Sequence, residues 1–178
     1  MGQGSPSITA RSDILYKTVV MGDSMYGNNY RRRNSLRLKG YNYSRAGAYF
    51  ITICTANRKH LFGRIHHGVM HLNEYGKIAH KTWAHLSDSF PSIRLDAFVI
   101  MPNHIHGIII LKKHAQKKPS IPQIISWFKS RTSRQINYLQ NSTGTIWHRS
   151  YHDRIIRDKR AFRNIRKYIL NNPKKWRK

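Results

Sequence analysis

Segment 101–111 constrains the fold more than any other part of this chain, because it places two histidines inside an otherwise apolar run. Side chains alternate between the two faces of a β-strand, so a strand here would point His104 and His106 the same way, about 7 Å apart. Apolar residues occupy both of its faces, and such a strand needs cover on both sides of its sheet. Two imidazoles on a rigid strand can share one metal ion, although histidine pairs also arise by chance in a chain with 11 histidines.

Hydrophobic periodicity and turn residues predict the other elements, with Asn73 and Ser120 as the N-caps of two long helices. In chain order we expect a strand at 47–55, a hairpin at 61–72, a helix at 74–90, strands at 94–101 and 104–111, a helix at 121–139, a strand at 151–157 and a helix at 158–171. This βαββαβ order with an added helix predicts an α+β, ferredoxin-like domain with an antiparallel sheet. The last helix is the element left to cover the histidine side of that sheet.

The predicted last helix carries Tyr168 and Asn172 one turn apart, so they share one face. A tyrosine oxygen can attack a backbone phosphorus and form a covalent phosphotyrosine, although a phenol with a pKa of about 10 needs help at neutral pH. A metal on His104 and His106 would supply that help, with the Asn172 amide as a third ligand; imidazole and oxygen ligands together suit Mg²⁺ or Mn²⁺. The alternatives are an ordinary half-buried helix tyrosine and a simple C-cap at Asn172, which precedes Pro173.

The charge of the chain predicts a polyanionic partner. Lys and Arg number 33 against 7 Asp and Glu, a formal net charge of +26. No stretch approaches the ~20 apolar residues of a membrane span and no secretory leader is visible, so nucleic acid is a better partner than a membrane. The single cysteine, Cys54, excludes an intramolecular disulfide and fits a reducing cytoplasm. Charge alone does not separate an enzyme from a ribosomal-type RNA binder.

Several basic and aromatic residues are candidate DNA contacts. Residues 1–35 read as a flexible basic leader to a folded domain at 36–178, and an aromatic segment at 147–151 could stack on unpaired bases. Between 154 and 178 there are 11 basic residues and one acid. The candidates are Arg31, Arg32, Arg33, Trp147, Arg149, Arg154, Arg157, Arg163 and Lys167. The alternatives are an aromatic lead-in to a strand and a solvated basic helix face.

Six sequence blocks together resemble a known family. They are LRLKGYNY at 36–43, GAYFITICT at 47–55, LNEYGKI at 72–78, MPNHIHG at 101–107, WHRSYHD at 147–153 and YILNNP at 168–173. Over about residues 35–176 the chain resembles the REP-associated tyrosine transposases, which are relatives of single-strand insertion-sequence transposases in the HUH endonuclease superfamily. The histidine block and the Tyr-x3-Asn-Pro block are the most specific part of this match.

The resemblance implies a role for each candidate site residue. His104 and His106 would be the metal ligands, Tyr168 the nucleophile and Asn172 the third ligand. The implied activity is cleavage of single-stranded DNA at or near palindromic hairpins, followed by strand transfer. Cleavage would leave a 5′-phosphotyrosine and a free 3′-OH. We expect the protein to act at the bacterial nucleoid as a monomer or homodimer. The rival interpretation is a non-catalytic DNA- or RNA-binding regulator that keeps the same fold.

Overall fold

The computed structural model of the chain describes residues 40–113 and 119–176. The predicted leader at 1–35, with Arg31, Arg32 and Arg33, lies outside the described residues. Among the described residues, no helix combines the length and the apolar character needed to cross a bilayer.

The described residues form an α+β domain around a four-stranded antiparallel sheet in the order β4-β5-β1-β6. The strands are β1 (Gly47–Cys54), β4 (Ile93–Met101), β5 (His104–Leu111) and β6 (His152–Ile156), and a separate hairpin consists of β2 (Gly63–His66) and β3 (Val69–Leu72). The helices are α1 (Glu74–Ala84), α2 (Leu86–Ser89), α3 (Ile121–Gln140) and α4 (Lys159–Asn171), with short 3-10 turns η1 (Ala56–Arg58) and η2 (Pro173–Lys175). The predicted element order is therefore present.

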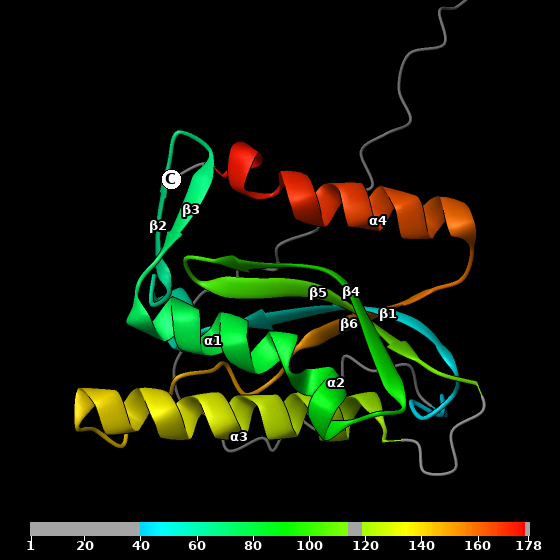
Figure 1. The fold of residues 1–178 in the computed structure, drawn as a ribbon, viewed down its shortest axis with the longest axis horizontal. Helices are drawn as coiled ribbons and strands as arrows, with labels where there is room; N and C mark the ends of the chain where they lie inside the picture. The colour runs from blue at the N-terminus through cyan, green and yellow to red at the C-terminus, as the bar shows by residue number, and fades with distance from the viewer. Residues whose placement is uncertain (1–39, 114–118, 177–178) are drawn as a thin grey trace, which may run out of the picture. The chain divides into compact units, whose positions relative to one another are not determined.

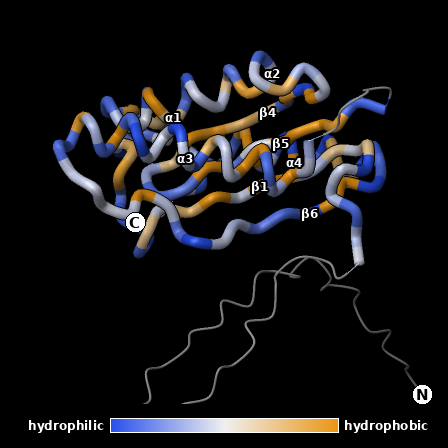
Figure 2. Tube along the Cα trace, turned by 90° about the horizontal axis from the view of Figure 1, so that it is seen from below, coloured by the Kyte–Doolittle hydropathy of each residue, from blue (hydrophilic) through white to orange (hydrophobic). Residues whose placement is uncertain are grey.

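Helices cover both faces of the sheet, as the apolar histidine strand requires. Helices α1, α2 and α3 lie on one face and α4 lies on the other (Figure 1). The first face buries the larger core, which includes Trp83, Phe128 and Ile105. The second face buries a smaller cluster in which Ile165 and Ile169 of α4 pack on sheet residues. Figure 2 shows the hydrophobic strands β1, β4 and β5 side by side and a more hydrophilic β6 at the edge.

The helix boundaries agree with the predicted caps, with one correction. Asn73 caps α1 by accepting a hydrogen bond from the Gly76 N–H at 2.9 Å, and Ser120 forms a capping box with Gln123 at the start of α3. The single helix predicted at 74–90 is instead two helices. The backbone leaves helical geometry at His85 (φ −92°, ψ 11°), and α2 follows as one short turn.

A glycine in β5 lets α1 approach the sheet closely. A Cβ atom built on Gly107 would lie 2.3 Å from the indole ring of Trp83. Trp83 is fully buried and belongs to the larger core. Gly107 follows His106 directly, so this contact sets how far the strand that carries the histidines lies from α1.

Candidate active site

The structure brings His104, His106 and Tyr168 together on the face of the sheet that α4 covers. The two imidazole centroids are 4.5 Å apart. The Tyr168 hydroxyl lies 3.3 Å from Nε2 of His106, and the two ring centroids are 5.3 Å apart. Phe50 of β1 packs against both rings, with centroid distances of 5.2 Å to His106 and 6.1 Å to Tyr168. A helix and a strand that are distant in sequence thus place a phenol beside an imidazole.

The other nitrogen of each imidazole is held by a side-chain oxygen. His104 Nδ1 is 2.7 Å from the Asn103 amide oxygen, which only accepts, so His104 carries its proton on Nδ1 and donates it. His106 Nδ1 is 2.8 Å from the Thr52 hydroxyl, which pairs with the same tautomer. Nε2 is then the nitrogen with the lone pair in each ring, and in His106 it lies 3.3 Å from the Tyr168 hydroxyl. Such support by neighbouring side chains is typical of metal-binding histidines.

Burial keeps both imidazoles in the form that a metal needs. It lowers the pKa of His104 to about 4, helped by the positive charge of Arg58. Burial lowers the pKa of His106 to about 3, helped by the neighbouring His104. Charging either ring would place a cation in a poorly solvated site. Both imidazoles are therefore neutral at pH 7, which is the protonation state of a metal ligand.

The donor set fits a divalent ion that keeps oxygen ligands. Among the described residues, no third His, Cys, Asp or Glu side chain joins His104 and His106 to make a metal-binding cluster. Asn172 keeps helical geometry (φ −58°, ψ −44°) despite preceding Pro173, so it shares a face of the helix with Tyr168 and also serves as the C-cap of α4. The remaining coordination positions would fall to an amide oxygen, water and a substrate phosphate, as Mg²⁺ and Mn²⁺ accept.

Comparison with known proteins identifies the family. Residues 47–172 match the family model described as "Transposase IS200 like". The chain belongs to the IS200-like transposase family. Transposases of this family act on DNA and generally use divalent metals.

Two individual proteins illustrate the relationship. An uncharacterized protein of Haemophilus influenzae is 36% identical over 169 residues, which cover 85% of this chain and 93% of that protein. A solved structure of a REP-associated tyrosine transposase bound to a REP hairpin has 20% sequence identity and a TM-score of 0.52, over 76% of this chain and 71% of that one. The second likeness shows a shared fold and agrees with the resemblance drawn from the sequence blocks.

Among the residues of this transposase predicted to contact DNA, Trp147 has a different role in the structure. Its side chain is only 4% exposed, and its indole N–H donates to the Thr132 hydroxyl at 2.8 Å. Its ring packs against Phe62 and Phe128 in the larger core. Trp147 therefore belongs to the core of the transposase, and its ring is not available to stack on a base.

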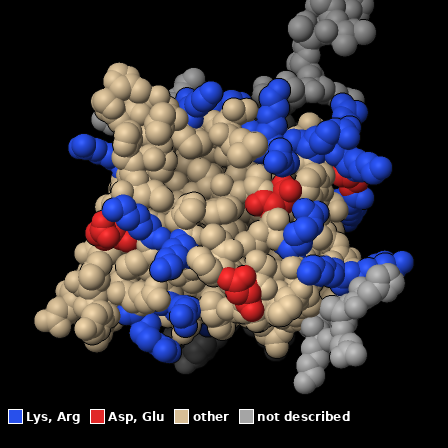
Figure 3. Space-filling view, in the orientation of Figure 1, with Lys and Arg blue, Asp and Glu red and all other residues tan. Residues whose placement is uncertain are grey.

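The other described candidates lie on the surface. Arg149, Arg154, Arg157, Arg163 and Lys167 are all exposed. Lysines and arginines gather over the α4 side of the molecule (Figure 3).

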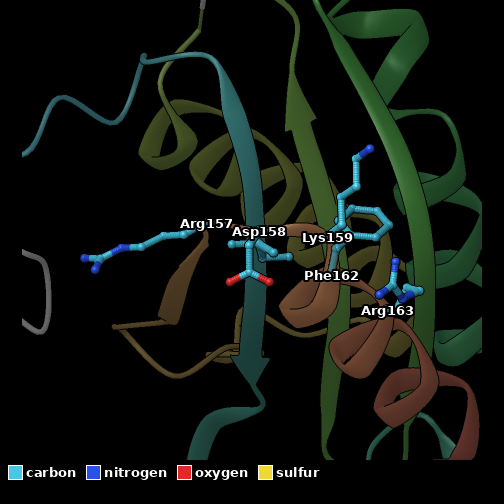
Figure 4. A pocket seen from close by; sticks show the side chains of 6 residues that line it. Arg157, Asp158, Lys159, Phe162 and Arg163 are labelled. Carbon is cyan, nitrogen blue, oxygen red and sulfur yellow. The ribbon is translucent and has the colours of Figure 1, made fainter.

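Two of these arginines line an open cavity of about 420 Å³ at the N-terminal end of α4. Arg157 and Arg163 point away from each other there rather than toward one point (Figure 4). This arrangement suits contacts to several phosphates along a strand better than one enclosed phosphate.

Several residues of the site were missed from the sequence. Asn103 precedes a predicted ligand and could have been considered from that position alone. Thr52 and Phe50 give no such signal, because their place beside His106 depends on how β1 pairs with β5. Trp176 also approaches the site, with its ring 5.9 Å from that of His104.

Proposed function

We propose that this chain is a metal-dependent single-stranded DNA endonuclease and strand transferase whose nucleophile is Tyr168. The observation that supports this most is the 3.3 Å approach of the Tyr168 hydroxyl to Nε2 of His106, in the same chain and next to His104. Family membership supports the transposase activity as a whole. The proposed plan of the domain is ferredoxin-like, in keeping with the strand order β4-β5-β1-β6.

In the proposed reaction, the Tyr168 oxygen attacks the scissile phosphorus. An O–P bond forms to the tyrosine while the bond from phosphorus to the 3′ oxygen breaks, leaving a 5′-phosphotyrosine and a 3′ oxygen that takes a proton from water. The phenolic proton also passes to water. Attack of a 3′-OH on the phosphotyrosine reverses these bond changes and joins strands.

The chain's own residues orient this reaction. Asn103 and Thr52 hold the two imidazoles, and Phe50 packs edge-on against the tyrosine ring at an interplanar angle of 89°. His104 and His106, with Asn172, would hold a Mg²⁺ or Mn²⁺ ion. When bound there, the ion polarises the scissile phosphate and stabilises the charge of the transition state.

The proposed substrate is single-stranded DNA that carries a hairpin. A structural relative is described as bound to a REP hairpin. The exposed cations Arg149, Arg154, Arg157, Arg163 and Lys167 would bind its phosphates, and Arg31, Arg32 and Arg33 of the leader would add contacts without sequence preference. We place this activity in the bacterial cytoplasm, at the nucleoid, in a monomer or homodimer.

Covalent capture tests the proposal. A labelled hairpin with a single-stranded flank is incubated with Mn²⁺ and the wild-type protein, and the protein–DNA adduct is resolved under denaturing conditions. We expect Tyr168→Phe to abolish the adduct and to leave DNA affinity nearly unchanged, because only the phenolic oxygen is removed.

Tyr138→Phe is the matched control, since Tyr138 is 87% exposed on α3 and should give the wild-type adduct yield. An adduct of wild-type yield in Tyr168→Phe, or one that maps to another tyrosine, would refute the assignment. A wild-type protein that binds the hairpin but forms no adduct would favour the non-catalytic regulator.

A further inference from the structure

One carboxylate ties the helix of the proposed nucleophile to the sheet. Asp96 of β4 is one of only 7 acidic residues in the chain, and its side chain is 16% exposed. Its Oδ1 accepts a hydrogen bond from Nε of Arg166 in α4 at 3.0 Å, and its Oδ2 lies 3.9 Å from Arg94. Arg166 precedes Tyr168 by two residues. The carboxylate is therefore linked to the nucleophile by a short, rigid piece of helix.

A β-bulge gives Asp96 this position. The pairing of β4 with β5 shifts between Leu95, which opposes Ile109, and Phe98, which opposes Gly107. Three steps along β4 thus match two along β5, so one residue of β4 is extra. Asp96 and the next residue, Ala97, share that irregular stretch, and Ala97 packs in the cluster beneath α4. Bulges of this kind redirect side chains and are frequent beside active sites.

The remaining contacts of α4 with the sheet are mainly apolar. Ile165 and Ile169 pack on Phe50, Ile108 and Ile156. Burial of this apolar stripe sets which face of α4 lies on the sheet, but apolar attraction has no direction of its own and restrains smaller rotations about the helix axis only weakly. A charge-assisted hydrogen bond at 3.0 Å is directional and resists such a rotation.

Arg166 and Tyr168 contact the sheet on opposite sides of the helix. Residues two apart are separated by about 200° around an α-helix. Arg166 contacts β4, whereas Tyr168 contacts His106 of β5 and Phe50 of β1. Rotation of α4 that breaks one contact would also displace the other.

We propose that Asp96 is a positioning residue that fixes the rotation of α4, so that Tyr168 faces the histidines of its own chain. The expected effect on the reaction rests on the proposed function. The position of the Tyr168 ring can be measured without any reaction. A partly exposed ion pair adds little to overall stability. The role we assign therefore concerns geometry and predicts a loss of rate larger than any loss of stability.

The test compares Asp96→Asn with Glu74→Gln. Glu74 forms a 2.7 Å ion pair with Lys77 within α1, on the other face of the sheet. Each substitution removes one carboxylate and raises the net charge by the same amount, so the overall charge attraction for DNA changes equally. Asp96→Asn breaks the ion pairs to Arg166 and Arg94, and Glu74→Gln breaks the one to Lys77. We expect Asp96→Asn to form adduct about tenfold more slowly at saturating DNA, because small displacements of a reacting group are costly. Glu74→Gln should keep the wild-type rate, and both variants should bind DNA alike.

A second measurement needs neither DNA nor metal. A 3-fluorotyrosine placed at residue 168 reports the surrounding His106 and Phe50 rings through its ¹⁹F resonance. We expect this signal to shift or broaden in Asp96→Asn but not in Glu74→Gln. The charge-swapped pair Asp96→Arg with Arg166→Asp should recover part of both the signal and the rate.

The outcomes separate the two proposals. An unchanged fluorine signal in Asp96→Asn, or a rate equal to that of Glu74→Gln, would overturn the positioning role. If Tyr168→Phe still forms the adduct, the proposed function fails, while the fluorine comparison still decides whether Asp96 seats the helix.

Discussion

At the scale of single residues, the side-chain oxygens that contact Nδ1 of each histidine matter as much as the histidines themselves. An imidazole without a partner on Nδ1 can rotate or change tautomer, and it then presents the wrong nitrogen to a metal. The acceptor-only amide oxygen of Asn103 prevents both for His104, and the Thr52 hydroxyl holds the orientation of the His106 ring. Thr52 comes from β1, so the pairing of β1 with β5 is part of the proposed metal site.

Replacing Thr52 tests this support directly. Thr52→Val keeps the shape of the side chain but removes the oxygen 2.8 Å from His106 Nδ1. We expect Mn²⁺ affinity, measured by calorimetry on the protein without DNA, to fall by about 10- to 100-fold, the usual cost of losing such a partner.

Thr52→Ser is the control, because it keeps the hydroxyl and should retain most of the affinity. Equal Mn²⁺ affinity in the valine variant and the wild type would mean that Thr52 does not orient a metal ligand.

At the scale of elements, local signals in the sequence were sufficient where local physics decides the structure. The strand at His104–Leu111 has the predicted bounds, and Asn73 and Ser120 cap the predicted helices. Alternation, helical periodicity and caps act over a few residues, so they can be read directly. The break at His85 was missed because the apolar period continues through it to Leu86 and Phe90.

The features that were not predicted depend on contacts between distant segments. Thr52 pairs with His106 only once β1 lies against β5, and Asp96 meets Arg166 only through a bulge and a docked helix. The approach of α4 to the histidines was predicted because the strand at 104–111 is apolar on both faces and one helix remained to cover it. The proposed nucleophile could be found from sequence, whereas the residues that position it could not.

Trp147 illustrates the same limit and gives a prediction for this part of the fold. An indole in a basic segment suits a DNA contact and a core residue equally well in sequence, and burial decides between them. We expect Trp147→Phe to lower the free energy of unfolding by about 1–2 kcal/mol in urea titrations. The substitution removes the buried hydrogen bond to Thr132 and leaves a space beside Phe128.

Single-stranded DNA affinity measured on the same Trp147→Phe protein should be unchanged at temperatures where it is folded. Tyr138→Phe, at an exposed ring, should change neither quantity. A selective loss of DNA affinity without a loss of stability would restore Trp147 as a stacking residue.

At the scale of the whole molecule, net charge controls how strongly the transposase attracts DNA. A net charge of +26 attracts any polyanion, so attraction alone cannot select one DNA. The exposed cations near α4 matter more specifically. Arg163 and Lys167 lie on the helix that carries Tyr168 and Arg157 lies just before it, on the side where lysines and arginines gather (Figure 3). A strand bound there would place its phosphates near the proposed nucleophile, and a flexible single strand reaches an in-line geometry more easily than a duplex.

Salt dependence tests whether this face carries the DNA. For single strands the logarithm of affinity falls by about 0.7 per neutralised phosphate for each log unit of salt. The triple variant Arg157→Gln, Arg163→Gln, Lys167→Gln should therefore lower the slope by about 2 if each cation contacts one phosphate. It should weaken a hairpin with a flank and a random single strand alike, because phosphate contacts position a strand without reading its sequence.

The matched control removes three exposed cations from the helices on the other face of the sheet, as Lys77→Gln, Lys81→Gln, Arg134→Gln. Both triple variants change the net charge equally, so a purely global attraction would reduce the two slopes to the same extent. A DNA path along α4 predicts a near-wild-type slope for the control and a reduced one for the α4 variant. Equal slopes would show that DNA binds without preference for the α4 face, and the phosphate contacts assigned to Arg157, Arg163 and Lys167 would have to be withdrawn.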